Sequence, residues 1–170
     1  SALRLSLRDQ AVAVVQRLTA VDNTFDASAS FDQRVTAAIA ITADEQAQLS
    51  LTDTQIHRNR VLCSGSNWLL TTGLFLSSPY FGESSEASMT ARRLKVSDNW
   101  CASSSNTVQV TVNAFSNLST TVSDFLIHNA PGRGLTIAGG FDSTGTFLNG
   151  TVTRHGQLGI SMSGESENAQ

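Results

Sequence analysis

The spacing of apolar residues in the first part of the chain predicts an amphipathic helix. Between Leu7 and Val21, apolar residues recur at alternating steps of four and three, and polar residues fill most of the positions between them. This periodicity places the apolar side chains on one face of a helix. We therefore expect a helix over residues 3–21, with a packing stripe made of Leu3, Leu7, Ala11, Val14 and Leu18.

The segment that follows carries signals of both helix and strand. Val35, Ala37, Ile39 and Ile41 alternate with other residues as in a half-buried strand, and Val and Ile favour a strand over residues 33–42. A capping box that starts at Ser30 favours a helix over the same residues. For residues 43–50, Thr42 followed by Glu45 favours a short helix.

Beyond residue 60 the pattern is that of short strands separated by turn residues. Asn149-Gly150, between β-prone runs, is typical of a two-residue hairpin and favours antiparallel pairing. No fixed repeat period is visible, which argues against a solenoid or a propeller. The expected strands are 60–63, 68–76, 91–97, 107–115, 122–127, 135–138, 146–153 and 157–162.

These elements predict an α+β fold, in which an N-terminal amphipathic helix packs on an antiparallel β-sheet or β-sandwich. A length of 170 residues with 40% hydrophobic residues and a net charge of −3 suits one folded domain. Within it we expect a helix at 1–21, a mixed connecting segment at 22–59, a β-rich part at 60–164 and a flexible tail at 165–170. All twelve glycines and both prolines lie at position 65 or later, which marks the same division.

Charge and hydropathy exclude two classes of function. An isoelectric point near 5.5 gives no general attraction to nucleic acid. No run of eighteen apolar residues is present in these 170 residues, so none of them is expected to span a membrane.

Two cysteines, Cys63 and Cys101, are interpreted as a disulfide. They are too far apart for a redox CxxC motif, and no Cys/His spacing suits zinc. A bridge closing this loop would stabilise the fold by roughly 3–4 kcal/mol and would indicate an oxidising compartment. The alternative is two buried free thiols in a cytosolic protein. Abundant Ser and Thr and a single lysine favour the periplasm or the exterior.

No constellation of residues indicates catalysis, a metal or a cofactor. The three histidines, His57, His128 and His155, show no metal-binding or catalytic spacing. We therefore expect no catalytic residues, no metal and no cofactor. Three aromatic residues could line a sugar-binding groove, although core packing is the simpler interpretation: Trp68, Tyr80 and Trp100.

Two stretches are similar to the minor pilins and pseudopilins of the GspH/FimT type, which help build type IV pili and type II secretion pseudopili. The first is Asn59-Arg60-Val61-Leu62-Cys63 followed by Trp68 and Gly73. The second runs from Gly140-Phe141-Asp142-Ser143-Thr144-Gly145 through Asn149-Gly150 to Ile160-Ser161-Met162-Ser163-Gly164. The resemblance covers about residues 50–164.

The resemblance implies a non-catalytic subunit of a periplasmic or extracellular filament. Its partners would be other pilin-like subunits or copies of itself, with no nucleic acid, and its contact with a membrane would be through an upstream helix outside this sequence. Two alternatives stay open: another surface assembly protein, such as a capsid or adhesin β-sandwich, and a secreted carbohydrate-binding module or hydrolase.

Overall fold

The chain forms strands joined by turns in the part that the computed structural model describes, which comprises residues 3–26, 37–62, 70–78, 86–101, 107–141 and 143–164. No helix occurs among these residues. The strands are β1 (Leu3–Leu7), β2 (Val12–Gln16), β3 (Thr19–Val21), β4 (Thr24–Asp26), β5 (Ile39–Ala43), β6 (Gln48–His57), β7 (Arg60–Leu62), β8 (Leu70–Ser77), β9 (Ser88–Ser97), β10 (Trp100–Cys101), β11 (Thr107–Ser116), β12 (Ser119–Ser123), β13 (Leu126–Ala130), β14 (Arg133–Phe141), β15 (Thr144–Leu148), β16 (Thr151–His155) and β17 (Ile160–Gly164).

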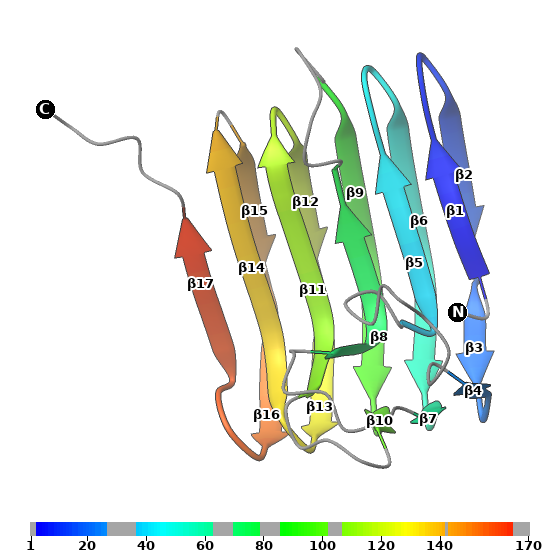
Figure 1. Ribbon diagram of the computed structural model, residues 1–170, viewed down its shortest axis with the longest axis vertical. Coiled ribbons are helices and arrows are strands. Elements are labelled where there is room, and N and C mark those ends of the chain that lie inside the picture. The colour runs from blue at the N-terminus through cyan, green and yellow to red at the C-terminus, as the bar shows by residue number, and fades with distance from the viewer. Residues whose placement is uncertain are drawn as a thin grey trace, which may run out of the picture.

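The strands form a parallel β-solenoid. Each strand pairs in parallel with strands of the neighbouring turns of the chain, here called coils. The first sheet has the order β1-β5-β8-β11-β14-β17, and the second contains β2, β3, β6, β9, β12, β13, β15 and β16. Figure 1 shows the first sheet in front of the second, with the short third sheet, β4-β7-β10, at the lower end.

The register shows a coil length that changes along the chain. One inward column of the first sheet runs through Leu3, Ile39, Leu74, Val110, Leu135 and Ile160. Its steps are 36, 35, 36, 25 and 25 residues. The argument against a solenoid was therefore wrong, because the longer coils hide the 25-residue repeat of the shorter ones.

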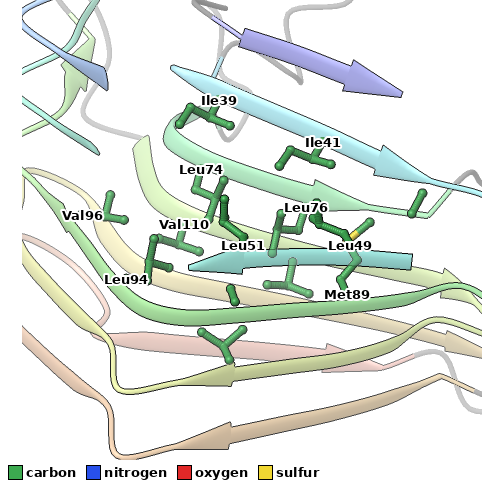
Figure 2. Close-up of a cluster of buried hydrophobic side chains, with 14 of the residues drawn as sticks. Ile39, Ile41, Leu49, Leu51, Leu74, Leu76, Met89, Leu94, Val96 and Val110 are labelled. Carbon is green, nitrogen blue, oxygen red and sulfur yellow. The ribbon is translucent and has the colours of Figure 1, made fainter. Parts of the chain in front are cut away.

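The core lies between the two large sheets. Inward residues of β5, β8 and β11 face inward residues of β6 and β9, as Figure 2 shows for ten labelled side chains. Burial of such aliphatic side chains stabilises the fold by roughly 1.5–3 kcal/mol each. The fully buried aliphatic side chains include Ile39, Ile41, Leu51, Ile56, Leu74, Leu76, Leu94 and Ile127.

The predicted N-terminal helix is wrong. Residues 3–21 form β1, β2 and β3, which are separated by turns in which Asp9 and Arg17 have positive φ. At each turn the alternation of inward and outward side chains starts again, and as a result the apolar residues are spaced as in a helix. Of the residues of the predicted stripe, Leu7 belongs to the core and Leu3, Ala11 and Leu18 pack against it, whereas Val14 is exposed on the outer face.

Several other expectations about local structure are corrected by the same pairing. The helix expected at 43–50 is a turn at Glu45 followed by β6, whereas Ile39–Ala43 is a strand, as Val and Ile favoured; residues 33–36 lie outside the described part. Asn149-Gly150 does not close a hairpin, because β15 and β16 pair with β12 and β13 and not with each other. The sheets are parallel, and the predicted antiparallel fold is wrong.

Candidate functional site

Residues in the left-handed region of backbone conformation form corners between strands and bends inside β6, β9, β13 and β16. Thirteen non-glycine residues among those described have φ between 43° and 58°. Eight of them are Asp or Asn, the non-glycine residues that adopt this conformation most readily. Because successive coils are in register, these corner residues stack into columns.

Two columns continue through five coils. The first corner column comprises Arg17, Asp53, Arg93, Asp124 and Asn149. The second corner column comprises Asp22, Arg58, Asp98, Asn129 and Arg154. In the first column acidic side chains alternate with basic or amide ones, and in the second this alternation runs from Asp22 to Asn129, after which Arg154 follows an amide.

Ion pairs and amide hydrogen bonds join some of the neighbouring members of each column. In the second column, Arg58 Nε and Nη2 donate to the two carboxylate oxygens of Asp22 at 2.7 and 2.6 Å. Asn129 Nδ2 donates to Asp98 Oδ1 at 2.8 Å. In the first column, Arg93 makes the same two-point contact with Asp53.

These contacts lower the pKa of three aspartates. The Arg58 hydrogen bond lowers the pKa of Asp22, and the Arg93 hydrogen bond lowers that of Asp53. For Asp98, partial burial opposes ionisation, but hydrogen bonds from Asn129 and Ser97 outweigh it and lower the pKa. Protonated His128 and His57 act in the same direction on Asp98.

A loss of stability in acid follows from these shifts. A carboxyl group with a lowered pKa in the folded state stabilises the fold above its unfolded value of 3.8, and this contribution is lost as pH falls through the folded pKa. The midpoint of urea unfolding should therefore fall when the pH is lowered from about 5 to about 3. The double variant Asp22→Asn/Asp53→Asn should show a smaller fall.

The control for this experiment is Glu86→Gln. Glu86 is exposed and has no ion pair with any described residue, so the substitution removes a carboxylate without breaking a corner contact. An equal acid-induced fall in wild type and in the double variant would contradict the assignment.

Buried asparagines form a second polar network beside the second corner column. Asn59 Nδ2 donates to Asn99 Oδ1 at 2.8 Å, and Asn23 Nδ2 donates to Asn59 Oδ1 at 2.8 Å. Asn99 Nδ2 in turn donates to Gln109 Oε1 at 2.7 Å. Asn59, Asn99 and Gln109 are almost completely buried, so this network satisfies polar groups that would otherwise be costly inside the core.

A shallow open groove lies along the second corner column. Its volume is about 580 Å³. Its wall combines one aromatic ring, one carboxylate, one amide and two guanidinium groups, and it is lined by Arg58, Asp98, Trp100, Asn129, Ala130, Pro131 and Arg154. This mixture of apolar and convergent polar groups is typical of a ligand-binding site.

Trp100 and Arg154 are the two groups in the groove with most freedom to contact a ligand. Trp100 is 41% exposed, and Arg60 stacks over its ring at 4.8 Å from the centroid. No described residue makes an ion pair or a hydrogen bond with the Arg154 guanidinium. The other arginine of the groove, Arg58, is held by Asp22.

The residues singled out from sequence are only partly brought together. Trp100 lines the groove, whereas Trp68 and Tyr80 lie outside the described residues. Cys101 is buried in β10 beside Val61, and Cys63 lies outside the described residues, so their pairing stays a prediction.

Sequence reasoning missed the corner columns and the buried asparagines. Their signal is present as spacing: Asn23, Asn59 and Asn99 are 36 and 40 residues apart. Arg58 and Asp98 are also 40 residues apart, and they lie in the same two coils as Asn59 and Asn99. Because the number of residues between corresponding positions differs from coil to coil, the register between coils is not visible in the sequence.

The described residues contain no group of three or more metal-binding side chains, and no helix able to cross a membrane. No family model, curated protein or solved structure matches this chain.

Proposed function

We propose that the chain is a non-catalytic structural segment of a periplasmic or extracellular surface assembly, and that its solenoid ends join copies of itself. The observation that carries this proposal is where apolar surface is exposed. Of seven exposed large hydrophobic side chains among the described residues, only Trp100 lies away from the two ends of the solenoid. The six are Val12 and Val14, which lie on the outer face of β2 in the first coil, and, in the last two coils, Leu148, Leu158, Ile160 and Met162.

Ile160 and Met162 occupy positions that are inward-facing one coil earlier. They are in register with Leu135 and Ile137. Leu135 is 2% exposed, whereas Ile160 is 53% and Met162 73% exposed. Covering such side chains stabilises an association by up to roughly 1.5–3 kcal/mol each, and clustered apolar surface of this kind is typical of interfaces.

Charge favours a head-to-tail arrangement of copies. The second corner column has Asp22 in the first coil and Arg154 in the last complete coil. Stacking the last coil of one copy on the first coil of the next would place the cation Arg154 beside the anion Asp22. Contacts of this kind select orientation and partner.

The corrected fold changes the basis of the filament hypothesis. The packing stripe that a pilin-type subunit would present to its neighbours is divided among β1, β2 and the turns that flank β2, so the proposal rests on the solenoid ends and favours a surface assembly other than a pilin. A solenoid suits this role because each coil contacts only its neighbours and the molecule extends as a rod.

Sedimentation velocity over a range of protein concentrations tests the proposal. Wild type should form end-to-end multimers, and Ile160→Ser/Met162→Ser should weaken the association by about tenfold or more, because the exposed apolar area is reduced. Trp100→Ser is the matched control, since it removes an exposed apolar side chain that is not at an end. A wild type that stays monomeric, or an equal loss in Trp100→Ser, would refute end-to-end assembly.

A further inference from the structure

The ring of Trp100 stays 41% exposed although Arg60 of the preceding coil stacks over it. The neighbouring corner contacts between coils are made by polar side chains, and Trp100 belongs to none of them. An exposed indole in a groove offers a flat apolar face with a polar edge. This combination suits a ligand that has both an apolar face and polar substituents.

Arg60 fixes the orientation of the indole. The two residues are in register on β7 and β10, and the guanidinium lies 4.8 Å from the ring centroid. The contact restrains the ring before a ligand arrives. Restraint of this kind lowers the entropic cost of binding.

The polar groups of the groove are arranged along the solenoid axis. Arg58, Asp98, Asn129 and Arg154 belong to four successive coils. At roughly 4.8 Å for each step between paired strands, the column from Arg58 to Arg154 extends for about 14 Å. The groove is therefore long and open, and it matches an extended ligand better than a single small molecule.

The charges of the groove indicate the kind of substituent. Arg58 is neutralised by Asp22, and Asp98 accepts a hydrogen bond from Asn129. The Arg154 guanidinium has no such partner among the described residues. A guanidinium without a partner is suited to bind a carboxylate through two parallel hydrogen bonds.

We propose that this groove binds an acidic oligosaccharide containing uronic acid units. The carbon–hydrogen face of one sugar ring would stack on Trp100, its hydroxyl groups would bond to Asp98 and Asn129, and a carboxylate of the ligand would pair with Arg154. This inference goes beyond the structural role proposed above and does not depend on it: the two share Arg154 alone, and Trp100, Asp98 and Asn129 take no part in the proposed end-to-end contact.

Isothermal titration calorimetry with short galacturonate oligomers tests the inference, with cello-oligomers as the neutral comparison. Wild type should bind the galacturonate oligomer and bind the neutral oligomer at least about tenfold more weakly. Trp100→Ala and Arg154→Ala should each weaken galacturonate binding by about tenfold or more. Trp100→Phe should retain part of the affinity, because it keeps an aromatic face.

Arg4→Ala is the matched control for Arg154→Ala. Arg4 is an exposed arginine on β1, and none of the groove residues is its neighbour. Its removal should leave binding unchanged. Circular dichroism and urea unfolding establish that each variant is folded.

Three results would overturn the inference: no binding of the galacturonate oligomer to wild type, equal binding of the neutral oligomer, or equal affinities of Arg154→Ala and Arg4→Ala. The variant Ile160→Ser/Met162→Ser should bind the oligomer like wild type. Failure of glycan binding is thereby separated from failure of end-to-end assembly.

Discussion

Replacing Asn99 by alanine should lower the free energy of unfolding by about 3–5 kcal/mol. The Asn99 side chain is completely buried and makes four hydrogen bonds. Its Oδ1 accepts from the backbone N–H and the side-chain amide of Asn59, and its Nδ2 donates to Ile56 O and Gln109 Oε1. Alanine leaves these partners inside the core without a replacement, at a cost of roughly 1–3 kcal/mol for each group that stays unpaired.

Urea unfolding at equilibrium measures this loss, with Asn23→Ala as the control. Asn23 is half-buried at the end of the same network, and its side chain makes one hydrogen bond, to Asn59 Oδ1. Its replacement should cost about 1 kcal/mol. Equal losses in the two variants would show that position in the network has no effect.

Replacing Gly73 by alanine should lower the free energy of unfolding by about 3 kcal/mol or more, or prevent folding. A Cβ atom at this position would overlap the backbone carbonyl oxygen of Gln109 and would lie 2.6 Å from Val96 Cγ1. The Gln109 oxygen belongs to the adjacent strand and cannot move without disturbing the sheet. Because Gly73 has no Cβ atom, β8 can lie this close to Gln109 of β11 and to Val96 of β9.

The control for Gly73→Ala is Gly139→Ala, on β14 of the same sheet. The nearest atom to a Cβ at Gly139 is Ser163 O at 4.0 Å. This variant should stay within about 0.5 kcal/mol of wild type in thermal or urea unfolding. If both variants were equally stable, the overlap at Gly73 would be relieved by a small shift of the chain.

The sequence predicts where most strands of the second half lie, but it does not predict how they pair. The expected runs at 107–115 and 135–138 fall inside β11 and β14, because Val108, Val110 and Val112 alternate clearly. Pairing depends on the register between coils. A search for one repeat period does not find this register, because the steps are about 36 residues in the first coils and 25 residues in the last ones. Alternation within a strand carries no information about the direction of its partner.

The absence of glycine before residue 65 was misleading for a physical reason. Turns in this part of the chain are made by non-glycine residues in the left-handed conformation, such as Asp9, Arg17 and Glu45. Arg and Glu adopt this conformation at a cost of about 1 kcal/mol, which the surrounding sheet must offset. A sequence interpretation that identifies turns by Gly and Pro therefore joins three short strands into one helix.

The candidate site was predictable only at Trp100. Arg58, Asp98 and Arg154 are separated by 40 and 56 residues along the chain, and no motif connects them. They come together because Arg58 and Asp98 follow β6 and β9, and Arg154, inside β16, occupies a register position that continues the same column. Knowledge of the coil register would have been sufficient to find them.

The equal steps in the last coils have a consequence for how such a chain can change in length. From β11 to β14 to β17, and from β12 and β13 to β15 and β16, corresponding residues are 25 positions apart. A duplication or deletion of a 25-residue block would keep every inward side chain inward and every corner residue at a corner. Such an event changes the rod by one strand spacing, roughly 4.8 Å, so its length can evolve in discrete units without redesign of the core.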